Sequence, residues 1–262
     1  MIVIKYGGHA LPTPGTQDPV IGLLAKEFAA HHSLVLVHGG GPQIDAELAL
    51  HGIPREMIGG YRKTTPEVFA VVQKVLSGDV LRTLVNQFVS YGIKAVGLSA
   101  GDGALLRVHQ MRPLVNGEAV DIGLVGDIEK VNPRILINLL NDGFLPVISP
   151  VAVDSKGQGF NVNADIAAGA IAGSLNADEM IFMTDVAGIY RNYPDPGSLI
   201  KQIDVEELRI LQPTFVEGMA PKVKAALTAL DAGAKQVRVI DGREIENLKN
   251  ALNGLGGTVI SK

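Results

Sequence analysis

The stretch SLVLVHGGGPQID, residues 33–45, contains the pattern on which the fold depends. It begins with a short run of branched apolar residues, which is typical of a strand buried on both faces of a sheet. Three glycines follow, and Pro42 then stands near the start of a segment with helical periodicity, where proline is favoured. A buried strand that turns tightly into a helix is the repeating unit of parallel sheets. This stretch therefore predicts an α/β fold.

The rest of the chain repeats this unit, because further apolar runs alternate with segments of helical period. The predicted strands cover residues 2–7, 33–39, 94–99, 145–151, 179–185 and 236–241. The predicted helices cover residues 18–32, 42–51, 65–91, 132–142, 163–176 and 219–232. The alternation indicates a mainly parallel sheet, and in such sheets ligands bind at the carboxyl ends of the strands.

Residues 105–131 depart from this alternation. Their β-branched residues flank the pair Asn116 and Gly117, and Asn-Gly is the strongest short-range signal for a hairpin turn. We expect an antiparallel β-hairpin flap in this part of the chain.

Composition narrows the class of protein. With 262 residues, a formal net charge of −4 and 47% hydrophobic residues, the chain resembles an ordinary globular protein. No dense cluster of Lys and Arg suggests a nucleic-acid partner, and the absence of cysteine excludes disulfides and thiolate chemistry. The N-terminus lacks the pattern of a targeting peptide, and Asp165 interrupts the longest low-charge stretch, which excludes a membrane span there. We therefore expect a cytoplasmic protein without nucleic-acid or membrane partners.

Two glycine turns, KYGGHA at 5–10 and VHGGGPQID at 37–45, each follow a predicted strand. Paired glycines are compatible with a simple tight turn, but they also let backbone N–H groups approach an anion closely. Neither the Walker spacing nor the dinucleotide-binding glycine spacing occurs in the chain. The turns, one of which carries Lys5, indicate an anion site of another kind.

Charged and polar residues near predicted helix starts add to this picture. Lys222 falls in the opening turn of a helix, where the macrodipole disfavours a cation unless an anion lies between them. Arg62 precedes a helix start at Thr64 or Thr65 and could clamp an anion through two hydrogen bonds. Asn163 and Asp165 are common helix-start residues. Each of these residues also has an ordinary structural explanation, as a solvated surface charge or a cap. We assign no metal site to the histidines.

Nine motifs occur in order between residues 2 and 243: IKYGGHA, LVHGGGPQID, GYRKTTPE, VGLSAGDG, LPVISPVA, NVNAD, MTDVAGIY, EGMAPKV and VIDGR. Their order and spacing resemble the amino-acid kinase family. The resemblance implies a three-layer α/β/α sandwich that forms a single domain over residues 1–262. It also implies that an N-terminal lobe, about residues 1–150, binds an acyl amino acid and that a C-terminal lobe, about residues 151–262, binds ATP.

The resemblance implies one particular reaction, the ATP-dependent phosphorylation of the γ-carboxylate of N-acetyl-L-glutamate in arginine biosynthesis. A carboxylate is already nucleophilic at neutral pH, so this reaction needs positioning and charge neutralisation but no general base. That requirement agrees with motifs rich in lysine and glycine. Mg²⁺ would bind the ATP phosphates and reach the protein through water, so no metal ligands are assigned to the chain.

Matching positions carry the implied roles. Lys5 and Lys222 would flank the transferred phosphoryl group, and Asp165 would lie between them and hold both ammonium groups. Gly8 and Gly40 would donate backbone N–H groups to the phosphoryl oxygens. The acyl amino acid would be held by Gly40, Gly41, Arg62 and Asn161, with Arg62 on the α-carboxylate. The nucleotide would be bound by Gly7, Asn163, Asp185, Val186, Ala187, Gly188, Ile189, Tyr190, Thr214, Phe215, Val216 and Met219.

Some relatives carry an extra N-terminal helix that joins dimers into hexamers, whereas this chain starts its first predicted strand at residue 2. We therefore expect a homodimer with weak or no inhibition by arginine. Two alternatives stay open: a kinase of carrier-bound aminoadipate in lysine biosynthesis, and a non-catalytic nucleotide-binding sensor of the same fold. A carbamate or uridylate kinase would leave Arg62 without a purpose.

Overall fold

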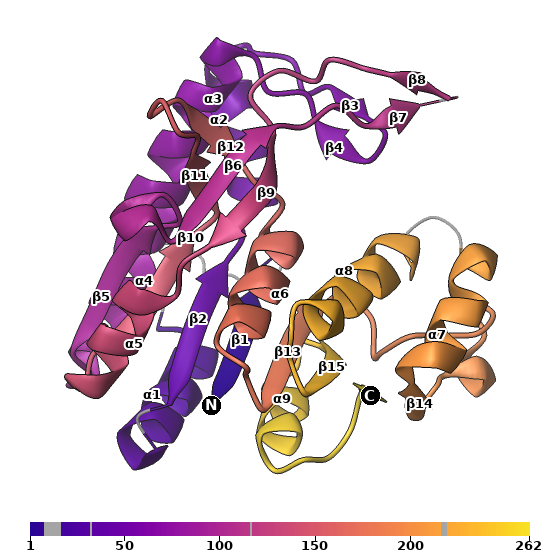
Figure 1. Ribbon diagram of the computed structural model, residues 1–262. Helices are drawn as coiled ribbons and strands as arrows, with labels where there is room; N and C mark the ends of the chain where they lie inside the picture. The colour runs from indigo at the N-terminus through magenta and orange to yellow at the C-terminus, as the bar shows by residue number, and fades with distance from the viewer. Residues whose placement is uncertain (8–16, 32, 116, 216–218) are drawn as a thin grey trace.

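The computed structural model describes residues 1–7, 17–31, 33–115, 117–215 and 219–262 (Figure 1). Its centre is an eight-stranded sheet in which all six predicted strands are present. Every neighbouring pair is parallel except β15 and β16, which are antiparallel. The strand order is β14 (Gln202–Asp204), β16 (Thr258–Ser261), β15 (Gln236–Asp241), β13 (Glu179–Thr184), β1 (Ile2–Tyr6), β2 (Leu34–His38), β10 (Leu145–Ser149) and β5 (Ala95–Ser99).

Helices cover both faces of this sheet, which confirms the predicted three-layer α/β/α architecture. One face carries α1 (Pro19–His31), α4 (Leu81–Ser90) and α9 (Ile245–Leu252). The other face carries α5 (Arg134–Asn141), α6 (Ala164–Ser174) and α8 (Met219–Asp231). The remaining α-helices are α2 (Gly41–Leu50), α3 (Pro66–Gln73) and α7 (Val205–Leu211). No helix in the described ranges is long and apolar enough to cross a bilayer.

The single helix predicted over residues 65–91 is wrong in detail. A π-helical segment, η2 (Lys74–Val80), separates α3 from α4. Within this wider segment the Ser77 hydroxyl lies 2.8 Å from the hydroxyls of both Ser99 and Ser149, at the ends of β5 and β10. Uninterrupted helical periodicity in the sequence gives no sign of this change of pitch.

A smaller mixed sheet lies beyond one end of the main sheet (Figure 1). Its order is β12 (Gly159–Asn161), β11 (Val151–Val153), β6 (Leu106–Gln110) and β9 (Gly126–Val131). Two short hairpins project nearby, β3 (Met57–Ile58) with β4 (Tyr61–Arg62), and β7 (Leu114–Val115) with β8 (Glu118–Ala119). The antiparallel pairing of β6 with β9 and of β7 with β8 confirms the predicted flap. Asn116 in its turn lies outside the described residues.

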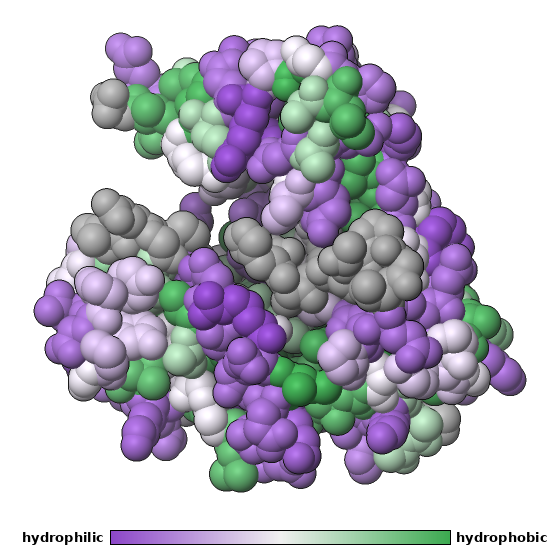
Figure 2. All heavy atoms as spheres, turned by 180° about the vertical axis from the view of Figure 1, so that it is seen from behind, coloured by the Kyte–Doolittle hydropathy of each residue, from purple (hydrophilic) through white to green (hydrophobic). Residues whose placement is uncertain are grey.

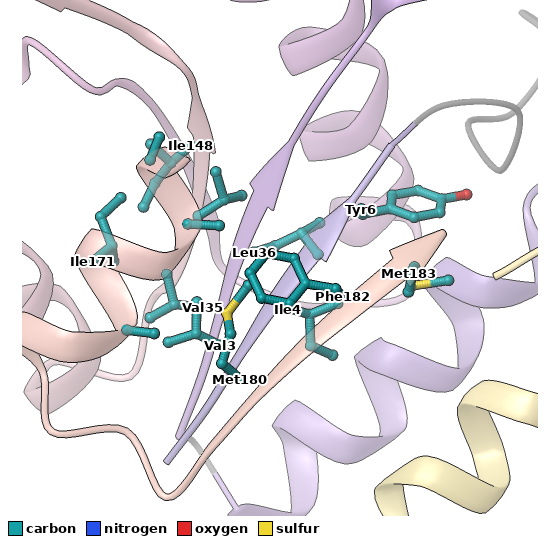
Figure 3. Close-up of a cluster of buried hydrophobic side chains, with 14 of the residues drawn as sticks. Val3, Ile4, Tyr6, Val35, Leu36, Ile148, Ile171, Met180, Phe182 and Met183 are labelled. Carbon is teal, nitrogen blue, oxygen red and sulfur yellow. The ribbon is translucent and has the colours of Figure 1, made fainter. Parts of the chain in front are cut away.

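Buried hydrophobic side chains cluster around the two central strands, β1 and β2 (Figure 3). Val3, Ile4, Val35 and Leu36 are fully buried between the helical layers. Full burial of each such side chain contributes about 1.5–3 kcal/mol. These strands are therefore firmly fixed in the core.

Candidate active site

A cavity of ≈ 250 Å³ opens at the carboxyl ends of β1 and β2. It is lined by residues from seven separate segments of the chain, so the fold and not the local sequence assembles it. The structure brings together here seven residues that the sequence assigned to the site: Lys5, Gly40, Gly41, Arg62, Asn161, Asn163 and Asp165.

The two glycine turns contact one another at the base of this cavity. A Cβ atom added to Gly7 would lie 3.1 Å from Cε of Lys5 and 3.2 Å from Cα of Gly39. A Cβ atom added to Gly40 would lie only 2.7 Å from a methyl carbon of Leu76. Both turns therefore need glycine so that backbone and side chains can approach closely. Gly8 lies outside the described residues.

Lys5 extends from β1 toward the first turn of α6. Its Nζ atom lies 3.0 Å from Oδ1 of Asp165, and the lysine side chain is only 13% exposed. The predicted cap on this helix is confirmed, because Oδ1 of Asn163 accepts hydrogen bonds from the backbone N–H groups of Asp165 and Ile166. Asp165 is thus held by its own helix start, and it holds Lys5.

Lys222 is the fourth residue of α8, as predicted, and its Nζ atom lies 3.2 Å from Oδ1 of Asp185. Asp185 directly follows β13, the neighbour of β1 in the sheet. Burial favours the neutral form of this carboxyl, but the Lys222 ammonium, a backbone hydrogen bond and the charge of Arg243 together outweigh burial and lower the pKa of Asp185. The chain's own carboxylate therefore supplies an anion near this helix start. The role of Asp165 toward Lys222 stays a prediction.

Arg62 lies on β4, and its side chain is 10% exposed. Its guanidinium pairs with Oδ1 of Asp45 at 2.6 Å, while Arg55 lies 3.5 Å from the other oxygen of that carboxylate. Asn161 also lines the cavity, and its side-chain amide donates to the Thr64 hydroxyl at 3.3 Å. The sequence reasoning missed Asp45, although it stands inside the quoted motif VHGGGPQID.

The predicted nucleotide loop, residues 185–190, leaves the carboxyl end of β13. It is fixed to β16 by Thr258, whose hydroxyl accepts a hydrogen bond from the Ile189 N–H at 2.8 Å. Gly188 packs so closely that an added Cβ atom would lie 2.3 Å from the same hydroxyl. Thr258 is a second residue that the sequence reasoning missed, because it is distant in the chain and belongs to no recognised motif.

The second predicted nucleotide segment lies near α8. Thr214 ends a short 3₁₀ turn, and the side chains of Phe215 and Met219 are buried. Val216 lies outside the described residues. The structure thus gives these residues a common neighbourhood at the start of α8, and their contact with a nucleotide stays a prediction.

A wider cleft of ≈ 1150 Å³ continues from the cavity and shares Asn163 and Asp165 with it. Its walls come from the β-hairpins on one side and from α8 on the other, including Arg112 and Lys224. Figure 2 shows the molecule hollowed between these two parts. Within the described ranges, no group of three or more His, Asp or Glu side chains is placed to hold a metal ion.

Comparison with known proteins gives a consistent result. The sequence pattern described as "Amino acid kinase family" matches residues 1–241. A protein of Mycolicibacterium gilvum (strain PYR-GCK) named acetylglutamate kinase is 44% identical over 247 residues, which cover 93% of this chain and 84% of the relative. A protein of Cutibacterium acnes with the same name is 44% identical over 248 residues, or 92% of this chain and 80% of the relative.

Solved structures share the fold. N-acetylglutamate synthase from Neisseria gonorrhoeae, complexed with coenzyme A and N-acetyl-glutamate, superposes with a TM-score of 0.82 at 24% identity; the match covers 100% of this chain and 59% of the synthase chain. Carbamate kinase from Giardia lamblia bound to AMP-PNP gives a TM-score of 0.69 at 22% identity, covering 100% of this chain and 98% of that one. At these identities the likeness concerns the fold alone.

Proposed function

Because this chain belongs to the amino acid kinase family, we propose that it transfers the γ-phosphoryl group of ATP to the γ-carboxylate of N-acetyl-L-glutamate. Relatives named acetylglutamate kinase, at 44% identity over most of their length, support this substrate. The observation that carries the proposal is the cavity at the carboxyl ends of β1 and β2. It combines an anchored lysine, a nearly buried arginine and a wall of glycine backbone in one small space.

The cavity suits an acceptor with two carboxylates. Arg62 is nearly buried and fixed in place by Asp45, so its guanidinium is ready to pair with the α-carboxylate of acetylglutamate. Asn161 lines the same cavity, and Gly40 and Gly41 offer backbone donors without side chains in the way. This arrangement would direct the γ-carboxylate toward Lys5.

Phosphoryl transfer to this acceptor brings several negative charges together, so catalysis depends on positioning and on charge neutralisation. In our proposal Lys5 and Lys222 flank the transferred group, Asp165 positions Lys5, and Gly8 and Gly40 donate N–H groups to its oxygens. The γ-carboxylate attacks phosphorus and ADP leaves, and no proton has to be removed from the acceptor. Bound Mg²⁺ would neutralise charge on the ATP phosphates.

The nucleotide would lie on the C-terminal lobe, about residues 151–262, while the acyl amino acid would lie on the N-terminal lobe, about residues 1–150. The fixed loop that follows β13 and the start of α8 support this division, because both lie next to the Lys222–Asp185 pair. The assigned nucleotide contacts are Gly7, Asn163, residues 185–190, Thr214, Phe215, Val216 and Met219.

The test is a coupled assay of ADP release with acetylglutamate, glutamate, and free and carrier-bound aminoadipate as acceptors. We expect turnover with acetylglutamate at least about tenfold above the others, because the acyl and carboxylate contacts are both needed for positioning. A preference for carrier-bound aminoadipate would favour the lysine-biosynthesis alternative. ATP binding without turnover on any acceptor would favour the sensor.

We also propose that the protein is a homodimer located in the cytoplasm. An apolar groove between α2 and the η2–α4 segment, with Leu50 81% exposed beside it, supports association of two copies. Light scattering tests the dimer, and a hexamer would contradict it.

Cell fractionation tests the proposed location in the cytoplasm. Arginine titration of the activity tests the expectation of weak or no inhibition.

A further inference from the structure

His38 ends β2, directly before the glycine turn, and its side chain is fully buried. Its Nδ1 atom lies 2.9 Å from the carbonyl oxygen of Gly39. We infer that His38 is a positioning residue: it donates this hydrogen bond and thereby holds the Gly39–Gly40 peptide so that the Gly40 N–H faces the cavity. The inference rests on the proposed function, in which Gly40 donates to a phosphoryl oxygen.

The geometry of the peptide unit connects the two groups. A trans peptide is planar, so its C=O and N–H bonds point in opposite directions. A hydrogen bond that holds the Gly39 C=O toward His38 therefore turns the Gly40 N–H away from His38. Gly39 and Gly40 both line the cavity, whereas His38 is buried and is not part of its wall. Within the described ranges no protein acceptor takes the Gly40 N–H.

The Gly39–Gly40 peptide needs a hydrogen bond to fix its orientation. It joins two glycines, which restrict backbone rotation less than any other residue. The flanking groups are already fixed, because the Gly39 N–H donates to the Tyr6 carbonyl at 2.8 Å and the Ile44 N–H donates to the Gly40 carbonyl at 2.9 Å. The imidazole of His38 hydrogen-bonds to the Gly39 carbonyl, which belongs to the Gly39–Gly40 peptide between these two fixed groups. This hydrogen bond therefore fixes the last free peptide unit of the turn.

The protonation of the ring agrees with this role. A carbonyl oxygen only accepts, so Nδ1 must carry the proton. Burial lowers the pKa of His38 to about 4, so the ring is neutral near pH 7 and Nε2 has no proton. Nε2 is also a buried atom without a hydrogen-bond partner among the described residues. The unprotonated, unpartnered Nε2 atom is therefore the consequence of using Nδ1 as the donor.

Two variants separate hydrogen bonding from packing. His38→Asn keeps an N–H donor at the same number of bonds from Cβ as Nδ1, whereas His38→Leu keeps apolar bulk and loses the donor. We expect His38→Leu to lower kcat by about 10- to 100-fold, less than the roughly 10²–10³-fold cost of deleting a preorganised donor. KM for acetylglutamate should change less than about threefold, and His38→Asn should recover most of the loss. Equal losses in both variants, or near-normal kcat in His38→Leu, would overturn the inference.

A second measurement does not depend on activity. Long-range ¹H–¹⁵N NMR spectra of the wild-type protein, with the His38 signal assigned by its absence in His38→Asn or His38→Gln, report which ring nitrogen carries the proton. The expected result is the Nδ1–H form, and the Nε2–H form would refute the inference. A wild-type protein that shows Nδ1–H but does not phosphorylate acetylglutamate would refute the proposed function and leave the role of His38 in fixing the turn intact.

Discussion

Nζ of Lys5 lies 3.0 Å from Oδ1 of Asp165, although the two residues are far apart in the chain. The lysine leaves the end of a central strand, and the aspartate stands in the first turn of a helix capped by Asn163. Both elements contribute buried side chains to the hydrophobic core. The ion pair therefore holds a cation at a fixed place beside the glycine turns, where a phosphoryl group would need it.

Arg62→Ala should mainly weaken substrate binding. A hydrogen-bonded charge pair contributes about 1.5–3 kcal/mol, so KM for acetylglutamate should rise about 10- to 100-fold, while KM for ATP stays close to the wild-type value. Arg55→Ala is the matched control, because Arg55 approaches the same carboxylate but is 57% exposed. Steady-state kinetics with each substrate varied in turn measures the effect. An unchanged KM for acetylglutamate would remove Arg62 from the acceptor site.

Asp45→Asn should disturb the same site indirectly. The amide keeps the size of the side chain but removes the charge that pairs with the nearly buried Arg62. We expect KM for acetylglutamate to rise and the free energy of unfolding to fall by about 2 kcal/mol. Urea unfolding followed by circular dichroism gives the second quantity. If Asp45→Asn binds acetylglutamate more tightly, Asp45 competes with the substrate for Arg62 instead of positioning it.

Gly40→Ala should impair turnover through a steric clash. The new methyl group would lie 2.7 Å from a methyl carbon of the buried Leu76, so either that side chain or the turn would have to shift. We expect kcat to fall by up to about 10²-fold, the scale of losing one preorganised donor. Gly78→Ala in the nearby π-helical segment is the control, because its added Cβ atom meets nothing within 4 Å. A Gly40→Ala variant with normal kcat would show that this turn adapts freely.

His38 should make the folded state less stable in mild acid. Its pKa is about 4 in the folded protein and about 6.5 in an unfolded chain, so between these pH values the unfolded state binds more protons. Stability therefore falls as the pH falls through this window, by at most about 1.4 kcal/mol per pH unit from this group. Urea unfolding between pH 7 and pH 5 should show a shallower pH dependence in His38→Asn. Equal slopes for both proteins would contradict the low pKa.

Much of the fold follows from local signals. The six buried strands are apolar runs, the Thr65 and Asn163 caps are side chains next to helix starts, and the glycine turns mark where β1 and β2 end. Each signal lies within a few residues of the structure it predicts. The residues that line the cavity could be predicted for the same reason, because they belong to motifs at strand and helix ends.

The missed features depend on contacts between distant segments. Asp45 looks like any carboxylate on a solvated helix face until β4 brings Arg62 to it. Thr258 becomes part of the site only because β16 pairs antiparallel with β15. The ion pair of Lys222 with Asp185, on the neighbouring strand end, was likewise not predicted, and the proposed contact of Lys222 with Asp165 stays a prediction. The three-dimensional arrangement of strands, helices and hairpins decides these contacts, and a single sequence does not state it.

The most direct test of the central claim is a double-mutant cycle on kcat with Lys5→Ala, Lys222→Ala and the combined variant, with the exposed Lys26→Ala as control. If both ammonium groups act on one transferred phosphoryl group, each single variant should lose about 10²-fold or more. The double variant should then be far less impaired than the product of the two losses, because groups that act as a unit are not additive. Fully multiplicative losses, or near-normal turnover in either single variant, would contradict the shared role of the two lysines.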